Sequence, residues 1–431
     1  MARMALACRG WFRAGVAALG LILSAATMQL LTVEPAASQV GAVPLDWEQP
    51  VHLSTDATAG AFGPVIRADG NKRLIVVYGR PTEEGGTTVN RSVMRASLDQ
   101  GATWLPPTVV YTGAESAWQV TVAVDSSNLA HAVWRTENSI YHAREDQWPT
   151  VANEVATAEQ VFSPAVALEA DDTIHVVWAQ RSQSAYTLTH AFSLDDGVTW
   201  AQQSLWSKGG RPDAPDLALD RNGQLHVVWQ QRSSKGLTFE HKILYKRGTR
   251  SDGDVNWDQE PTILSGDMFN VRLPTIEAVG DQLYVAFAQK EASDQTGSEH
   301  TVYVASYQPG VGWALPVDVS GGQSVGINAP LDSPQPAMLA CAGRLHVYFD
   351  GTIIENGKER IIGVWRRLGE QTWSDRHFVT NEDLQAIRPS LVCVENRLHL
   401  AYEAIIELNP NHQIYYVAGG NSLIHLPLVT R

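Results

Sequence analysis

Seven short hydrophobic runs, each ending in an aromatic side chain, recur along the chain. They are LIVVY (74–78), AHAVW (130–134), IHVVW (174–178), LHVVW (225–229), LYVAF (283–287), LHVYF (345–349) and LHLAY (398–402). The runs are apolar at nearly every position instead of alternating, which predicts strands that are covered on both faces. Helical periodicity is absent, so we expect neighbouring sheets to provide this cover.

The runs belong to a longer repeat of roughly 50 residues, which is close to the period of known propellers. Six of them follow a proline at an almost constant distance, and Val120 holds this place in the second repeat. These prolines are Pro64, Pro164, Pro215, Pro274, Pro336 and Pro389. A turn such as DRNG (220–223) separates the proline segment from the run and predicts a β-hairpin.

Each repeat continues with a third hydrophobic run, a turn and a tryptophan that starts a fourth strand. The tryptophans are Trp104, Trp148, Trp200, Trp257, Trp313 and Trp373. Four short antiparallel strands form one propeller blade. We therefore predict an all-β chain folded as a β-propeller of about seven four-stranded blades, with six blades as the alternative.

Two segments compete for the place that closes the ring. WEQPVHL (47–53) precedes the first repeat and has the features of a fourth strand without its first three. LIHLPLV (423–429), near the C-terminus, is the alternative.

The N-terminal residues have the features of an export signal. Arg3, Arg9 and Arg13 precede an uncharged stretch, and small residues follow up to Ser38. We expect a signal peptide at 1–38, a flexible mature N-terminus at 39–46 and a single propeller domain at 47–431. The protein would then be secreted or extracytoplasmic, and an uncleaved N-terminal anchor is the competing interpretation. No later segment is apolar enough to span a membrane, and we expect a monomer.

The net charge limits the classes of ligand, and the cysteine content limits the possible disulfides. The chain has a formal net charge of −14, and removing an arginine-bearing leader makes it more acidic. Such a surface repels nucleic acid, and no cofactor is implied. Cys341 and Cys393 remain after the leader, too few for a disulfide framework. Counted from their prolines they differ by one position, so we expect their side chains to point to opposite faces and to stay unbonded.

Two turns have a specific signature, SLDQGATW (97–104) and SLDDGVTW (193–200). Both match the Asp-box, and the chain from about Trp47 onward resembles the repeats of sialidase-like β-propellers. The acidic side chain can accept bonds from turn amides, glycine allows positive φ, and tryptophan fills the space between blades. The motif therefore predicts a fold, and the resemblance places the ligand at the opposite face.

A histidine recurs at the same place in five repeats: His131, His175, His226, His346 and His399. Equivalent positions of second strands lie on a circle too wide for bonds to one metal ion. We therefore expect packed histidines bonded to neighbouring turns, and no metal site.

Cations gather in the loops that should meet at the face opposite the Asp-boxes. They are Arg80, Arg181, Arg211, Arg232, Arg272 and Arg388. In an acidic protein such a cluster favours an anionic ligand, for example a sugar carboxylate. Pairing of these cations with loop carboxylates such as Glu83 and Asp213 is the alternative.

The resemblance to sialidases implies specific catalytic residues. Arg272-Leu-Pro274 is similar to the family's Arg-Ile-Pro motif, which makes Arg272 a substrate ligand and Asp294 the acid/base. The last repeat resembles the nucleophile region, with Tyr402 and Glu403 as the nearest tyrosine and glutamate pair. The chain departs from the family because glycine precedes Pro64 and because Arg388 and Pro389 occupy the place of the nucleophilic tyrosine. Tyr186 and Tyr415 are other substitutes, without a supporting motif.

Three functions follow from these observations. The first is a secreted propeller that acts on or binds anionic glycans, as an exo-α-sialidase-type glycoside hydrolase with incomplete catalytic motifs. The second is a non-catalytic propeller that binds carbohydrate or protein, with Trp118 and Phe269 as stacking surfaces. The third is an architectural envelope protein.

Overall fold

A computed structural model describes residues 46–419, except positions 58, 237, 252 and 269 and the segments 291–297, 322–324, 328–335, 353–358, 382–384 and 407–408. The described residues belong to one compact unit. The expected signal peptide at 1–38, nearly all of the expected flexible segment and the LIHLPLV segment lie outside the described residues. In the described part, no helix is long and apolar enough to cross a membrane.

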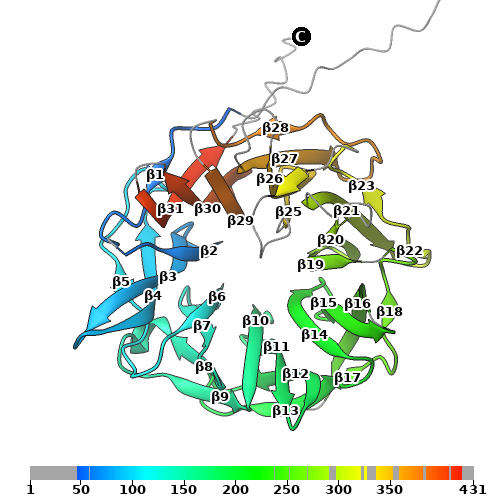
Figure 1. Ribbon diagram of the computed structural model, residues 1–431, viewed down its shortest axis with the longest axis horizontal. Coiled ribbons are helices and arrows are strands. Elements are labelled where there is room, and N and C mark those ends of the chain that lie inside the picture. Colours follow the sequence, from blue (N-terminus) through cyan, green and yellow to red (C-terminus); the bar gives the residue numbers. More distant parts are fainter. Residues whose placement is uncertain are drawn as a thin grey trace, which may run out of the picture. The chain divides into compact units, whose positions relative to one another are not determined.

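Small antiparallel sheets arranged radially make up this unit (Figure 1). The innermost strands of the seven blades are β2 (Phe62–Ala68), β6 (Trp118–Val124), β10 (Gln160–Leu168), β14 (Arg211–Leu219), β19 (Val271–Val279), β25 (Ala337–Cys341) and β29 (Gln385–Val394). The second strands are β3 (Leu74–Glu84), β7 (Ala130–Arg135), β11 (Ile174–Ser182), β15 (Leu225–Lys235), β20 (Gln282–Lys290), β26 (Arg344–Thr352) and β30 (Arg397–Ile406). Each predicted hydrophobic run lies in one of these second strands, so both the propeller and its seven blades are confirmed.

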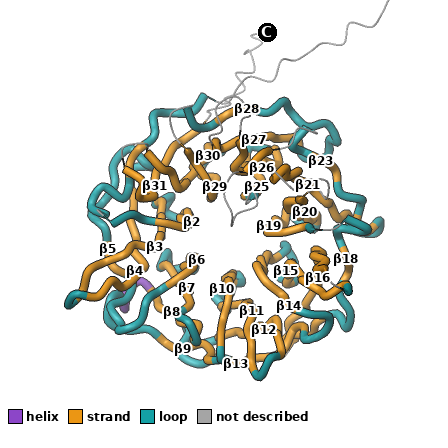
Figure 2. Tube along the Cα trace, in the orientation of Figure 1, coloured by secondary structure: helices purple, strands orange, loops and turns teal. Residues whose placement is uncertain are grey.

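The third strands are β4 (Thr87–Ser97), β8 (Ser139–Arg144), β12 (Ala185–Ser193), β16 (Thr238–Ser251), β21 (Ser298–Gln308), β27 (Glu359–Arg367) and β31 (Asn409–Gly419). The outer strands are β5 (Thr108–Val109), β9 (Asn153–Thr157), β13 (Ala201–Trp206), β17 (Asp254–Trp257) with β18 (Thr262–Ile263), β22 (Gly312–Trp313) with β23 (Val317–Asp318), β28 (His377–Phe378) and β1 (Val51–His52). A short strand, β24 (Val325–Ile327), pairs with both β21 and β26 and so joins the fifth and sixth blades. Figure 2 shows one short helical turn among the described residues, η1 (Glu145–Gln147).

The core consists of separate hydrophobic layers between neighbouring blades. The aromatic residues that end the second-strand runs are fully buried or nearly so, among them Tyr78, Trp178 and Phe287. Tryptophans of the outer strands pack against the preceding blade: Trp104 contacts Tyr416 with ring centroids 4.9 Å apart, and Trp257 contacts His190 at 5.2 Å. The ring is stable because each blade buries both of its faces on its neighbours.

The N-terminal segment closes the ring. Val51 and His52 of β1 pair with Tyr416 and Tyr415 of β31, so that the last blade takes its outer strand from the start of the chain. Trp47 bridges to Gly419 and packs edge-on against Tyr348 of the sixth blade. Of the two segments that the sequence offers for this place, WEQPVHL is therefore the one that pairs with the last blade.

Both Asp-boxes fold as the motif predicts. Ser97 Oγ donates to Asp99, while Asp99 accepts bonds from the backbone and hydroxyl of Thr103 at 2.8 and 2.6 Å. Asp195 makes the same contacts with Thr199. Several bonds to one carboxylate hold the pKa of Asp99 below its ordinary value, the hydroxyl of Thr103 having the largest effect. The turns are therefore structural, as predicted.

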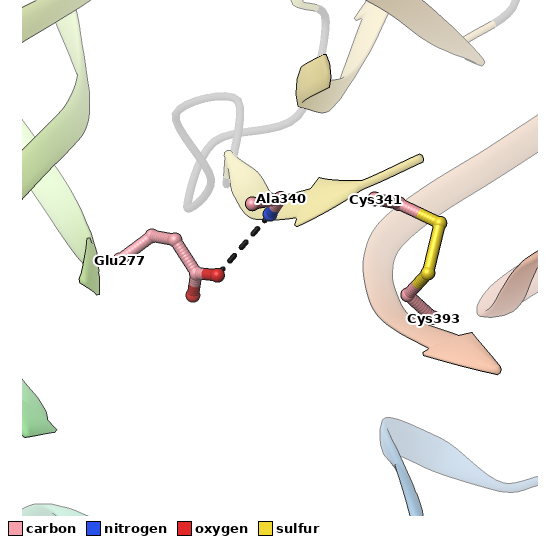
Figure 3. The surroundings of a disulfide bond; sticks show 4 residues. All are labelled: Glu277, Ala340, Cys341 and Cys393. Atoms are coloured by element: carbon pink, nitrogen blue, oxygen red, sulfur yellow. Dashed lines mark hydrogen bonds between the residues drawn. A yellow bond between two sulfur atoms is a disulfide. The ribbon is translucent and has the colours of Figure 1, made fainter. Parts of the chain in front are cut away.

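The expectation of two separate thiols is wrong, because Cys341 and Cys393 form a disulfide (Figure 3). Cys341 lies on β25 and Cys393 on β29, the inner strands of adjacent blades. In a propeller, the front face of one blade packs against the back face of the next blade. An offset of one position places one cysteine on the front face of its sheet and the other cysteine on the back face of its sheet. The two thiols therefore meet between neighbouring blades.

Candidate functional site

The inner strands surround a central channel with a volume of about 1090 Å³. All seven blades contribute to its wall. The Asp-box turns follow third strands, which run parallel to the inner strands, so they lie at the channel end away from the start of the inner strands. The mouth at the start of the inner strands is therefore the face that the sequence predicts for ligand binding.

A β-bulge shapes the mouth in every blade except the sixth, where the residue before Pro336 lies outside the described residues. The residue before the repeated proline position has positive φ: Gly63 (61°), Gln119 (50°), Ser163 (47°), Ala214 (45°), Leu273 (50°) and Arg388 (52°). The strand register shifts at the same point, for example between Arg272 and Thr275. Non-glycine residues rarely adopt this conformation, and such strain often occurs at functional sites. The bulges were not predicted from the sequence, although the repeated proline position was a signal for them.

Hydrogen bonds connect these bulges around one side of the mouth. Gln119 Oε1 accepts from Arg135 Nε at 2.6 Å and from the backbone N–H of Ser163 at 3.0 Å. Ser163 Oγ then donates to Asp213 at 3.1 Å, and Asp213 accepts from Arg211 at 3.1 Å. The chain of bonds runs from the second blade to the fourth, so it fixes the rim before any ligand arrives.

Next to this rim lies a group of basic side chains, which we call the cationic cluster: Arg211, Arg232, His241 and Arg272. Arg211 pairs in register with Arg232, which pairs with His241, so one row crosses three strands of the fourth blade. Arg272 comes from β19 of the fifth blade. Burial lowers the pKa of Arg272, and the positive charge of Arg232 lowers it further.

The cationic cluster has few internal counter-charges. The Nε atoms of Arg211 and Arg272 are buried and have no hydrogen-bond partner among the described residues. Asp213 forms an ion pair with Arg211, whereas no ion pair with a described residue involves Arg232 or Arg272. The guanidinium of Arg232 lies 3.6 Å from the ring centroid of Phe239, and that of Arg211 lies 4.7 Å from Phe162. Buried donors without acceptors are costly, so an anionic ligand would satisfy them.

Across the mouth, the first two blades present an aromatic pair. The rings of Phe62 and Trp118 stack with centroids 5.9 Å apart, and Trp118 is 39% exposed. Phe62 lies directly over Gly79, where an added Cβ would meet its ring at 2.3 Å. Both aromatic residues line the channel.

On the last blade, Glu403 is 1% exposed and lies at the centre of a second polar group. It accepts bonds from the backbone N–H of Gly63 at 3.0 Å, from Arg388 at 3.0 Å and from His412 Nδ1. Burial alone would raise the pKa of Glu403, but the bond from His412, the charge of Arg388 and the Gly63 amide together hold it below its ordinary value. The carboxylate is therefore ionised.

Deeper in the channel, Arg67, Asp216 and Glu277 carry charges from three blades. Asp216 accepts bonds from the hydroxyl of Thr275 and the backbone N–H of Ile276 on the next blade. Glu277 accepts from the backbone N–H of Ala340 at 3.1 Å (Figure 3). Burial, helped by the charge of Asp216, raises the pKa of Glu277 to about 7. These carboxylates tie neighbouring inner strands together.

The remaining predicted residues have other positions. Arg80 forms an ion pair with Asp56, and Arg181 lies 3.9 Å from Glu159. The Tyr402 hydroxyl is buried between the sixth and seventh blades without a hydrogen-bond partner among the described residues, and burial raises its pKa. Successive residues of a strand point to opposite faces, which separates Tyr402 from Glu403. Asp294 and Phe269 lie outside the described residues.

The recurring histidines are buried and bonded locally, as predicted. His175 contacts Glu169 at 2.7 Å and His190 at 3.0 Å, and His131 contacts Asp125 and His142 in the same way. The described residues contain no group of three metal-ligating side chains.

No protein-family model and no curated protein matches the chain. Solved structures do match. An ulvan lyase, a polysaccharide lyase bound to -[GlcA(1-4)Rha3S]-, has a TM-score of 0.59 at 11% identity, over 85% of this chain and 96% of that one. A protein of unknown function from Dyadobacter fermentans has a TM-score of 0.52 at 13% identity, over 87% and 98%. A Trypanosoma rangeli sialidase in complex with sialic acid has a TM-score of 0.47 at 14% identity, over 87% and 59%. At these identities the likeness shows the fold alone, a β-propeller.

Proposed function

We propose that this protein binds an acidic glycan at the channel mouth, with the cationic cluster holding the sugar's carboxylate or sulfate. The observation that carries the proposal is the pair of buried Nε atoms of Arg211 and Arg272, for which the described part of the chain supplies no hydrogen-bond acceptor. Arginine suits such groups because its planar donors match their oxygens.

Electrostatics support an anionic ligand. The chain as a whole is acidic, with a formal net charge of −14, yet three arginines and a histidine gather at one side of the mouth. Like charges placed together destabilise the free protein. A bound carboxylate or sulfate would offset this cost, so binding should weaken as salt concentration rises.

The aromatic pair supports a sugar as the carrier of the charge. Trp118 offers an exposed ring face on which the apolar face of a pyranose can stack, while its other contacts with Phe62 keep it in place. With cations on one side of the mouth and aromatic rings on the other, we propose an oligosaccharide ligand rather than a single sugar. The ulvan lyase was solved with a ligand of the same chemical class, containing glucuronate and sulfated rhamnose.

The sialidase-type hydrolysis that the sequence resemblance implies has less support. It needs a tyrosine in contact with a glutamate, and Tyr402 is buried away from Glu403. In the proposal, Arg211, Arg232, Arg272 and Arg388 keep their predicted role as glycan ligands, and Tyr402 has none.

We further propose an extracytoplasmic location. The disulfide between Cys341 and Cys393 favours an oxidising compartment, as does the arginine-bearing, apolar N-terminal sequence.

Calorimetric titration with oligosaccharides tests the proposed function. The probes are a polyuronate oligomer, a sulfated oligomer and a neutral oligomer of equal length. Wild-type protein should bind an acidic oligomer, and Arg272→Ala should weaken that binding by roughly 10-fold to 100-fold, because it removes a charge-assisted hydrogen bond.

The matched control is Arg367→Ala, which removes an exposed arginine paired with Glu370 near the other end of the propeller. This control should bind like the wild type. Equal binding of neutral and acidic oligomers, or equal losses in both variants, would contradict the proposal.

A further inference from the structure

The Glu403 group contains a histidine whose two ring nitrogens have different surroundings. His412 Nδ1 is hydrogen-bonded to Oε1 of the buried Glu403, whereas Nε2 has no partner among the described residues. The His412 side chain is 39% exposed, and Glu403 is 1% exposed. One nitrogen is thus anchored inside the protein and the other is open to the surface.

The charge of Glu403 determines which nitrogen carries the proton. The carboxylate is ionised and can only accept hydrogen bonds, so the neutral imidazole must place its proton on Nδ1. The exposed Nε2 then has a free lone pair. A buried carboxylate behind a histidine is the arrangement that orients an imidazole as a general base.

The position of this dyad matters for the ligand. Glu403 also accepts the backbone N–H of Gly63, a residue of the mouth, and both Arg388 and His412 bond to its Oε1. Glu403 therefore connects His412 to two residues of the channel wall, Gly63 and Arg388, and the Arg388 guanidinium shares Oε1 of Glu403 with His412. A base next to a cation can deprotonate carbon adjacent to a carboxylate, because the cation stabilises the charge that develops there.

We propose that His412 is the general base of an eliminative cleavage of uronate-containing glycans, with Glu403 as its positioning residue. This inference rests on the proposed function, since it requires an acidic sugar at the mouth. It assigns a reaction to a histidine that the sequence patterns did not single out.

The step is balanced without a cofactor. Nε2 of His412 takes the proton from C5, the carbon that bears the carboxylate. The released electron pair forms a double bond between C4 and C5 while the bond from C4 to the glycosidic oxygen breaks. The leaving oxygen takes a proton from water, and the imidazolium returns its proton to solvent.

Hydrolysis by Glu403 itself is disfavoured by the same geometry. Its oxygens are already occupied by three donors, and the side chain is buried, so it cannot attack a sugar carbon. Its place behind His412 suits orientation rather than nucleophilic attack.

The test measures the ultraviolet absorbance of unsaturated uronates during incubation of the whole protein with a polyuronate, together with calorimetric binding of an oligomer of the same polymer. Wild type should produce the absorbance. His412→Gln keeps an N–H that can reach Glu403 but has no basic nitrogen. It should lose at least 100-fold in rate while binding the oligomer as wild type does.

His52→Gln is the matched control, since His52 is a partly buried histidine of the neighbouring β1 that bonds to Gln413 instead of a carboxylate. It should retain wild-type activity. Glu403→Gln should reduce the rate and alter the pH profile, and a circular dichroism melt would show whether it folds.

The outcomes separate the two proposals. Oligomer binding without any absorbance change, or absorbance unaffected by His412→Gln, would overturn the role of His412 and leave glycan binding intact. Absence of binding to every acidic oligomer would overturn the proposed function itself.

Discussion

Some side chains in the channel connect neighbouring blades and also determine the charge of the channel wall. Glu277 illustrates this, because its carboxylate accepts the backbone N–H of Ala340 on the next blade while desolvation inside the channel raises its pKa. Its raised pKa has a consequence for stability. The unfolded chain releases the proton near the ordinary value of 4.5 and the folded chain near 7, so the contribution of Glu277 to stability falls as pH rises through this window.

Replacing Glu277 by glutamine should remove this decrease in stability with rising pH. The amide oxygen can still accept from Ala340, and the side chain has no charge to bury. Between pH 5 and pH 8 the variant should gain roughly 1–3 kcal/mol of unfolding free energy relative to wild type. Urea unfolding at both pH values measures it, and parallel pH profiles for the two proteins would contradict this account.

Only some of the residues at the channel mouth could be predicted from the sequence. Arg211 and Arg272 were found because arginines precede two of the repeated prolines, but their unpartnered Nε atoms depend on packing. His412 lay outside every repeat pattern, and only folding brings it to Glu403 and Gly63. Tyr402 was chosen as the tyrosine next to Glu403, yet neighbours along a strand point to opposite faces.

Turns and strands show a closer agreement between pattern and structure. The Asp-box needs glycine for two reasons at Gly101: φ is 96°, and an added Cβ would lie 2.1 Å from the Tyr416 hydroxyl of the neighbouring blade. The hairpin glycine Gly85 has φ of 59° and open space around it. Substitutions at the two positions therefore distinguish the cost of backbone strain alone from the cost of strain together with lost packing between blades.

Gly101→Ala should lower the free energy of unfolding by about 3 kcal/mol or more, since strain and a clash add together. Gly85→Ala should cost only about 1 kcal/mol, which is the conformational part. Thermal unfolding of both variants gives the comparison. Equal losses would mean that the Asp-box turn does not pack against the previous blade as described.

For the whole molecule, the sequence limited ring closure to two candidate segments and did not predict the disulfide. The incomplete repeat at Trp47 made the first strand one of these candidates, and the structure shows that it completes the last blade. The bond between Cys341 and Cys393 depends on how equivalent sheets face each other around a ring. Together they fasten the last blade on both sides, through β1 and through the sixth blade.

Removing the disulfide should therefore weaken the closed ring. The double variant Cys341→Ala with Cys393→Ala should lose about 2–4 kcal/mol of unfolding free energy, because the unfolded chain is no longer constrained. Denaturant unfolding with and without a reducing agent measures this loss. Reductant should destabilise the wild type and leave the variant unchanged, whereas a wild type insensitive to reduction would argue against the bond.

The proposed function requires an acidic sugar at the channel mouth, and a crystal structure of the protein with a bound polyuronate oligomer tests this directly. We predict a ligand carboxylate within hydrogen-bond distance of the Nε atoms of Arg211 and Arg272, a pyranose ring against Trp118 and His412 Nε2 facing the sugar. An oligomer bound at the Asp-box face, or one at the mouth that leaves the cationic cluster untouched, would contradict it.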